Sequence, residues 1–263
     1  MRRKLVAGNW KMHFTATEAA ANVECLADAV TARDDVDVVV CPSYLSIAAV
    51  REATKRTRLE VGAQDVFWAA QGAFTGQVSA EMIKAAGCIY CIVGHSETRG
   101  RFGKVEVPSE TVCYFADSDH TVNLKIQALI NTGLRPILCV GETQSERDAN
   151  MTDAIISTQI ERALDGCQPD EMSELVVAYE PVWAIGTGNV CDATEAQRVC
   201  NLIRASISDR MNSELANAVR VLYGGSVKES NAKELFHQPD IDGGLVGGAS
   251  LNPREFAAIV RAA

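Results

Sequence analysis

The sequence predicts an α/β fold, a closed (β/α)8 barrel in which eight parallel strands form a cylinder inside a ring of helices. Two observations support this prediction. Eight short apolar runs alternate along the chain with longer segments of helical period. Most of these runs are continuously apolar, which is typical of strands covered on both faces. The length of 263 residues suits one such barrel, which usually needs about 250 residues, so we expect a single domain over residues 1–263.

The eight runs define the expected strands: Lys4–Trp10, Val36–Cys41, Arg58–Gln64, Cys88–Gly94, Arg135–Val140, Leu175–Glu180, Val219–Tyr223 and Ile241–Val246. An open doubly wound sheet is the alternative architecture. Such a sheet more often has fewer strands and a glycine fingerprint after the first one. Here the first run ends in Ala7-Gly8-Asn9-Trp10-Lys11, which is no such fingerprint, so the closed barrel is favoured.

The segments between the runs carry helix signals. Three apolar faces recur at helical spacing: Ala19, Val23, Leu26 and Val30; Val122, Ile126, Leu129 and Ile130; and Ile156, Ile160, Ala163 and Leu164. Gly133 stands where a helix C-terminal cap is expected. Capping patterns predict helix starts at Thr194 and at Asn252-Pro253. Residues 100–113 have no clear period, and we expect an irregular insertion there on the rim of the barrel.

Composition and charge exclude several classes of protein. The 25 Lys and Arg residues against 34 Asp and Glu residues give a net charge of −9. No basic stripe for nucleic acid is visible, and no apolar run approaches the roughly 18 residues of a membrane span. The nine cysteines are irregularly spaced, which indicates free thiols and a cytoplasmic protein. The pair Cys88 and Cys91 has no second Cys/His pair to complete a metal site, so we expect none.

Polar residues and glycine turns gather at the ends of the predicted strands. They are Asn9, Lys11, Asp65, His95, Glu142, Glu180, Gly224-Gly225-Ser226 and Gly247-Gly248. In a parallel barrel the carboxyl ends of all strands open on one face. The shared position of these residues therefore predicts a site on that face.

The glycine turns after the last two strands predict a phosphate site. Without a Cβ the backbone can approach an anion closely, and the amides of a following helix point at it. Two tight turns without a ligand are the alternative. An acidic protein with a local anion site suits a small phosphorylated metabolite better than a polymer.

Two residues suggest acid–base chemistry. Glu180 closes an apolar run, and poor hydration there would favour its protonated form and strengthen it as a base. His95 precedes a helix that we expect to begin at Ser96, whose amides would keep the imidazole neutral and able to donate to a carbonyl. A surface glutamate, a structural histidine and, for Lys11, an ordinary surface charge are the alternatives.

The segment Pro181–Gly188 directly follows the candidate base. Its stiff start, apolar middle and glycine-containing end are what a mobile lid over a site requires. An immobile hydrophobic loop is the alternative. We call this segment the lid below.

Seven motifs in order along the chain resemble the triosephosphate isomerase family. They are Ala7–Met12, Gly72–Gly76, Gly94–Glu97, Cys139–Glu142, Tyr179–Gly188, Leu222–Val227 and Leu245–Ser250. The resemblance implies a TIM barrel that interconverts dihydroxyacetone phosphate and D-glyceraldehyde 3-phosphate, a step of glycolysis and gluconeogenesis, without a cofactor. A phosphate-binding lyase or synthase and a non-catalytic binding barrel are the alternatives. The first would need a Schiff-base lysine or a metal cluster, and the second would be expected to lose Glu180, His95 or Lys11.

The resemblance also implies a role for each site residue. Glu180 would move the proton between neighbouring carbons, and His95 would polarise the carbonyl and relay protons between the oxygens. Lys11 and Asn9 would stabilise the enediolate and hold the substrate, with Glu97 as a supporting carboxylate near Lys11. Backbone amides would bind the phosphate at four residues: Gly186, Ser226, Gly247 and Gly248. A homodimer is implied, in which the loop Gly72–Gly76 inserts into the partner subunit beside Asn9 and Lys11.

This sequence departs from the family pattern at three places. Thr98 and Gln77 replace an arginine and a glutamate that pair across the dimer interface in the family, so both charges are missing together. Asp65 stands where asparagine is common, and if buried it would be protonated or hydrogen-bonded. An extra segment of about a dozen residues follows Arg99; we expect it to alter the rim and not the chemistry.

Overall fold

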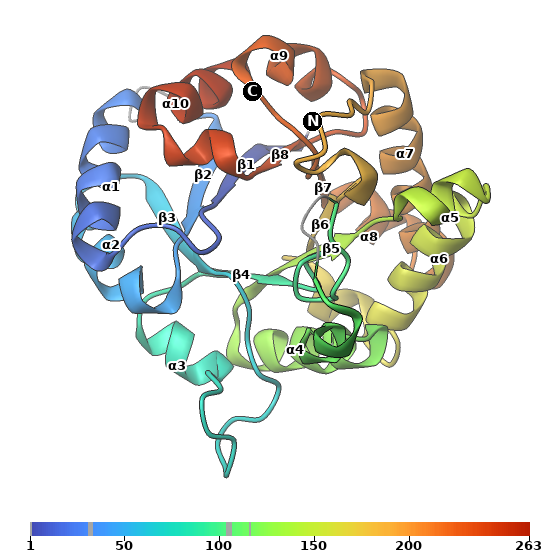
Figure 1. Ribbon diagram of the computed structural model, residues 1–263, viewed down its shortest axis with the longest axis horizontal. Helices are drawn as coiled ribbons and strands as arrows, with labels where there is room; N and C mark the ends of the chain where they lie inside the picture. The colour runs from blue at the N-terminus through green and yellow to red at the C-terminus, as the bar shows by residue number, and fades with distance from the viewer. Residues whose placement is uncertain (1, 31–33, 104–106, 116) are drawn as a thin grey trace.

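The computed structural model describes residues 2–30, 34–103, 107–115 and 117–263. Eight parallel strands close into a barrel in sequence order, and helices surround it (Figure 1). The strands of this described part are β1 (Lys4–Asn9), β2 (Val36–Cys41), β3 (Leu59–Ala63), β4 (Tyr90–Val93), β5 (Arg135–Val140), β6 (Val176–Tyr179), β7 (Arg220–Tyr223) and β8 (Gly243–Val246). The predicted closed (β/α)8 barrel is confirmed.

Ten α-helices occur in the described residues: α1 (Ala16–Val30), α2 (Ile47–Thr54), α3 (Ala80–Ala85), α4 (Asp119–Thr132), α5 (Gln144–Asp148), α6 (Thr152–Ala163), α7 (Ala193–Arg210), α8 (Ser213–Ala218), α9 (Glu229–Phe236) and α10 (Pro253–Ala262). Short 3-10 turns interrupt the connections: η1 (Tyr44–Ser46), η2 (Ser109–Tyr114), η3 (Pro169–Met172), η4 (Val182–Ala184) and η5 (Gly248–Leu251). None of these helices is both long and apolar enough to cross a membrane.

Most strands are continuously apolar because seven of the eight contribute side chains to two hydrophobic clusters, whereas β3 contributes to the outer cluster alone. One set of strand side chains fills the inside of the barrel: Leu5, Ala7, Val39, Cys41, Tyr90, Ile92, Ile137, Cys139, Val176, Ala178, Leu222 and Leu245. The alternate residues, such as Val6, Val40 and Val177, pack outward against the helices. Successive side chains of a strand point to opposite faces, so both faces of the cylinder are buried.

Several local signals of the sequence act as expected. Gly133 ends α4 in the left-handed conformation with φ of 73°. Asn252 caps α10 by accepting from the amides of Arg254 and Glu255, with Pro253 in the first position. The predicted start of α7 at Thr194 is wrong. Asp192 is the cap, because its side chain accepts from the amide of Glu195 at 2.8 Å and so begins the helix at Ala193.

The expected insertion at residues 100–113 is only partly irregular. Its centre, residues 104–106, lies outside the described residues. Its second half forms η2, and Phe102 and Phe115 pack edge to face at 5.2 Å between ring centroids across the ends of the segment. Gly103 presses against the lid, since a Cβ there would lie 2.3 Å from the carbonyl oxygen of Ile185.

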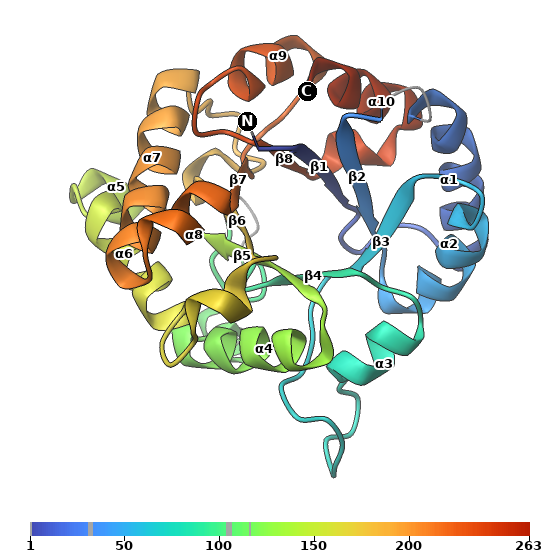
Figure 2. The same cartoon turned by 180° about the vertical axis from the view of Figure 1, so that it is seen from behind.

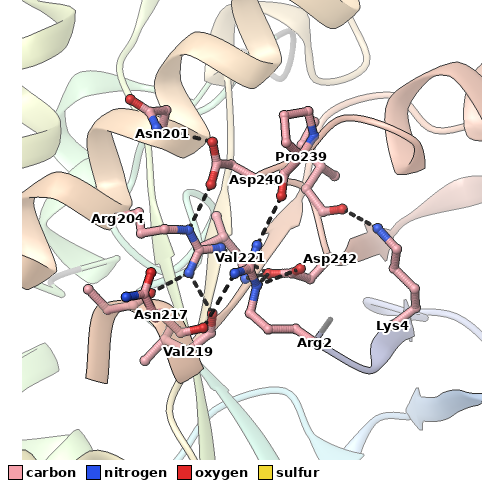
Figure 3. A network of polar contacts seen from close by, with 12 residues as sticks. Arg2, Lys4, Asn201, Arg204, Asn217, Val219, Val221, Pro239, Asp240 and Asp242 are labelled. Carbon is pink, nitrogen blue, oxygen red and sulfur yellow. Dashed lines mark hydrogen bonds and ion pairs between the residues drawn. The ribbon is translucent and has the colours of Figure 1, made fainter. Parts of the chain in front are cut away.

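A network of polar contacts links the start of β1 to the segment before β8 (Figure 3). The carboxylate of Asp242 accepts from Arg2 at 2.8 Å, from Arg204 at 3.0 Å and from the amide of Val221 at 2.9 Å. Asp240 accepts from Arg204 at 2.9 Å. These contacts join the start of β1, helix α7, strand β7 and the loop before β8, so the buried charges are paired.

Candidate active site

A cavity of about 320 Å³ opens at the carboxyl ends of the strands. It is lined by eight of the residues that the sequence singles out: Asn9, Lys11, His95, Glu180, Gly186, Ser226, Gly247 and Gly248. Glu97 lies behind the cavity, and its carboxylate contacts Lys11. The parallel barrel brings these residues together because they lie at the carboxyl ends of β1, β4, β6, β7 and β8 or belong to the lid.

Glu180 directly follows β6, and only 2% of its surface is exposed. Its Oε1 lies 2.8 Å from Nε2 of His95, and its Oε2 accepts from the amide of Ser96 at 2.9 Å. Burial raises the pKa of this carboxyl, but the contacts with His95 and Ser96 outweigh burial and lower the pKa below its ordinary value. The expectation that burial would dominate is therefore wrong for the ligand-free chain.

His95 is buried beside two carboxylates. Burial lowers the pKa of His95, but the Glu180 carboxylate raises it overall. The amide of Glu97 donates to Nδ1 at 3.1 Å, which leaves the hydrogen of the neutral imidazole on Nε2, facing Glu180. This geometry opposes full protonation and sets which nitrogen carries the hydrogen.

The helix expected to begin at Ser96 does not form. Residues 96–100 make hydrogen-bonded turns, and the next α-helix begins at Asp119. Thr98 donates from its hydroxyl to the carbonyl of His95 at 2.9 Å, and the amide of Arg99 reaches the same carbonyl at 3.1 Å. A single amide of a turn, and not the end of a helix, opposes protonation of Nδ1, while the Glu180 carboxylate raises the pKa of His95 overall. The expectation that helix amides keep the imidazole neutral is therefore wrong for the ligand-free chain.

Lys11 is held in an unusual backbone conformation beside Asn9. Its φ of 49° is uncommon for a residue with a side chain. The side-chain oxygen of Asn9 accepts from the Lys11 amide at 3.0 Å, and Gln64 donates to the Lys11 carbonyl at 2.8 Å. The Lys11 ammonium lies 2.5 Å from Glu97. These contacts direct a positive charge into the cavity opposite Glu180.

The glycine turns leave open space at one end of the cavity. A Cβ on Gly248 would meet nothing within 4 Å, and one on Gly247 only the Lys11 side chain at 3.6 Å. A Cβ on Gly225 would instead lie 2.3 Å from the Tyr223 hydroxyl. Gly225 thus permits close packing, whereas Gly247 and Gly248 leave room for an anion at the start of η5.

The lid contains η4 and ends in two glycines of positive φ, 68° at Gly186 and 90° at Gly188. The indole of Trp183 donates to Oε1 of Glu142 at 2.8 Å, and the Tyr179 hydroxyl donates to the same oxygen at 3.1 Å. The Arg147 guanidinium lies 4.3 Å from the centre of the Trp183 ring. Burial raises the pKa of Glu142, which these donors partly offset.

The sequence did not reveal that Glu142 accepts hydrogen bonds from Trp183 and Tyr179, although its position after β5 was visible. A carboxylate directly after an apolar strand could equally face the cavity, and only the fold shows that it faces the lid. The hydrogen bond from the Ser96 amide to Glu180 could not be predicted, because a backbone amide has no signature in the pattern of side chains. Asp65 is hydrogen-bonded, because Lys125 donates to it at 2.7 Å and also contacts Asp117; burial raises the pKa of Asp65.

No cluster of three or more metal-binding side chains occurs among the residues whose positions the structure describes. The nine cysteines are all unpaired, and Cys88 and Cys91 are both buried, as expected of structural thiols. The polar side chains that line the cavity are two carboxylates (Glu180 and Glu255), two ammonium groups (Lys11 and Lys228), the His95 imidazole, the Asn9 amide and the Ser226 hydroxyl.

This fold and this cavity define a (β/α)8-barrel protein in which a buried carboxylate contacts an imidazole beside two glycine turns. The profile of the family described as triosephosphate isomerase matches residues 4–263. Proteins named triosephosphate isomerase are similar over nearly their whole length: 48% identical in Moorella thermoacetica, covering 99% of this chain and 98% of the relative, and 46% in Syntrophotalea carbinolica with the same coverage. The protein of that name from Lactobacillus helveticus is 40% identical and covers 98% of each chain. The chain belongs to the triosephosphate isomerase family, which confirms the resemblance and disfavours the lyase, synthase and binding-module alternatives.

Proposed function

We propose that this chain interconverts dihydroxyacetone phosphate and D-glyceraldehyde 3-phosphate by proton transfer through an enediolate, with no cofactor. The observation that carries the proposal is the 2.8 Å contact between Glu180 and His95 inside a cavity that also holds two glycine turns. Proton removal beside a carbonyl needs a base, a donor to the carbonyl oxygen and a fixed substrate. The cavity supplies all three.

Glu180 would take the proton from one carbon and return it to its neighbour. In the ligand-free chain its negative charge is held by His95 and Ser96. A substrate carbonyl that accepts from Nε2 of His95 would take away the first of these donors. Burial would then raise the pKa of Glu180, which makes it a stronger base when the substrate is in place.

His95 would donate from Nε2 to the substrate oxygens and relay a proton between them. The Glu97 amide at Nδ1 fixes the hydrogen on the nitrogen that faces the cavity. Lys11 and Asn9 would stabilise the developing negative charge on the enediolate oxygen. Glu97 holds the Lys11 ammonium and would keep it aimed at that oxygen.

The phosphate would bind to backbone amides of Gly186, Ser226, Gly247 and Gly248. The described backbone contacts give the amides of Gly248 and Ala249 no acceptor within the chain, whereas Ser250 donates to Gly247. Free amides at the start of a helical turn favour an anion. Gly186 belongs to the lid, so binding of the phosphate would draw the lid over the enediolate and exclude water.

We also propose a homodimer formed through the loop Gly72–Gly76. The segment between β3 and α3 projects beyond the ring of helices in both views (Figures 1 and 2). Within this segment Phe67 stacks on Trp68 and also packs against Phe74, and Phe74 remains 46% exposed. Met12, beside Lys11, is 94% exposed. Exposed apolar groups of this kind support burial against a second copy. Unpaired cysteines support a cytoplasmic location.

Turnover in heavy water tests the proposed reaction. The purified chain, given D-glyceraldehyde 3-phosphate without nucleotide or metal, should form dihydroxyacetone phosphate. Deuterium should appear on the carbon that Glu180 protonates, since the proton that Glu180 carries can exchange with solvent before it is returned. Absence of turnover, or conversion that requires an added cofactor, would contradict the proposal.

A further inference from the structure

The phosphate end of the cavity contains a cation to which the proposed mechanism gives no task. Lys228 lines the cavity together with Ser226, Gly247 and Gly248, and its side chain is exposed. We propose that Lys228 recognises the phosphate dianion of the substrate and so determines specificity for phosphorylated trioses. This inference rests on the proposed function and adds a residue to it.

Lys228 is a second ammonium group that lines the cavity, beside Lys11, which the proposed function assigns to the enediolate oxygen. Lys11 is paired with Glu97 at 2.5 Å, and Glu180 is held by His95 at 2.8 Å. Within the described ranges Lys228 forms no ion pair. An ammonium group with no carboxylate partner keeps its full field for an incoming anion.

The position of Lys228 in the chain also favours an anion at this end of the cavity. Lys228 directly precedes α9, at the helix end that carries partial positive charge, and Glu229 in the first turn supplies one negative charge there. A phosphate bound at the adjacent turn, which starts at Gly224 and includes Ser226, would be attracted by the Lys228 ammonium and by the helix end.

The surroundings of Lys228 contain charges of both signs. Lys228 and Glu255 line both the substrate cavity and an adjoining open groove, and Arg254 and Glu229 line that groove. Glu255 opposes an anion, while Arg254 adds a second cation from α10. Only Val227 separates Lys228 from Ser226 in the chain. Of these charged residues, Lys228 is therefore the nearest in sequence to the turn proposed to bind phosphate.

A local cation matters here because the whole chain carries a net charge of −9 and the substrate is itself an anion. Unpaired positive charge at the mouth of a site raises the local concentration of an anionic substrate. Salt screens this attraction over about 8 Å at physiological ionic strength. The contribution of Lys228 should therefore appear in substrate capture and decrease as salt is added.

The test compares K228A with K233A, which removes the same charge from an exposed position of α9 outside the cavity. For K228A, KM should rise about three- to tenfold while kcat stays unchanged. Competitive inhibition by inorganic phosphate should weaken by a similar factor, and kcat/KM should depend less on salt. K233A should match the unaltered chain. Thermal unfolding should not begin earlier in K228A, because the Lys228 side chain is exposed and forms no ion pair in the described residues.

Turnover of glyceraldehyde, which lacks the phosphate, separates recognition of the anion from general damage to the site. K228A should leave kcat/KM for glyceraldehyde unchanged. If K228A shows the KM, phosphate inhibition and salt dependence of K233A, the inference is overturned. If the unaltered chain does not turn over triose phosphates, the proposed function fails instead, and calorimetric binding of inorganic phosphate to both variants still decides the role of Lys228.

Discussion

Nε2 of His95 lies 2.8 Å from Oε1 of Glu180, and both side chains are buried at the mouth of the barrel. This contact sets the protonation of each partner. It lowers the pKa of Glu180 against the effect of burial and raises the pKa of His95 against the same effect. In the proposed mechanism a substrate would displace this contact to reach His95, and Glu180 would then become the stronger base.

The first prediction concerns the titration of His95. In Glu180→Gln the neighbouring negative charge is gone while burial remains, so the pKa of His95 should fall below its value in the unaltered chain. Nitrogen NMR of the imidazole measures this directly. An unchanged or higher pKa in the variant would show that Glu180 does not control the charge of His95.

The same pair makes stability depend on pH. The raised pKa of His95 adds stability that is present below its ordinary value of 6.5 and is lost as pH rises through the folded value. The lowered pKa of Glu180 adds stability that is present above 4.5 and is lost as pH falls through the folded value. The free energy of unfolding should therefore differ most between the chain and Glu180→Gln in the window between these two ordinary values. Urea unfolding across pH measures that difference, and a difference that is constant with pH would contradict the coupling.

The next prediction concerns the contact between the insertion and the lid. A Cβ on Gly103 would lie 2.3 Å from the carbonyl oxygen of Ile185 and 2.7 Å from that of Val182, so Gly103→Ala should displace the lid. We expect kcat to fall about tenfold, as gating contacts of a lid can limit turnover, and phosphate loss from the exposed enediolate to increase. Gly166→Ala is the control, because Gly166 has a positive φ but open space around it. Equal kinetics in the two variants would show that this contact does not restrain the lid.

The proposed dimer gives a prediction about paired charges. The Thr98 hydroxyl donates to the carbonyl of His95 within its own turn, and Gln77 is exposed on the projecting loop. Neither side chain is charged. Thr98→Arg alone should weaken the dimer, because an unmatched cation would be buried. Adding Gln77→Glu should restore dimerisation. Sedimentation of both single variants and the double variant gives the coupling energy, and a coupling of zero would reject the pairing across the interface.

The sequence located the eight strands well because each strand of a closed barrel is buried on both faces. The predicted strand Leu175–Glu180 and the observed Val176–Tyr179 differ only at their ends. The site residues followed from the same periodicity, since strand ends share one face. Fold and location of the site are thus consequences of apolar patterning.

Other features depend on contacts between distant segments and could not be read locally. The lowered pKa of Glu180 needs the amide of Ser96, which is 84 positions away in the chain. The start of α7 at Ala193 was decided by Asp192 over Thr194, both of which are good caps. The packing of Gly103 on the lid requires the folded insertion. The contacts of Ser96 and Gly103 join distant segments of the folded chain, whereas the start of α7 was a local choice between two neighbouring caps.

The most direct measurement of the central claim is kcat for Glu180→Gln with D-glyceraldehyde 3-phosphate. The amide keeps the shape of the side chain and can still accept from Ser96, but it cannot take a proton. The account predicts that kcat falls by about 10²–10⁴, the usual contribution of a general base, while circular dichroism shows an unchanged fold. A variant that turns over substrate as fast as the unaltered chain would contradict the assignment of Glu180 as the base.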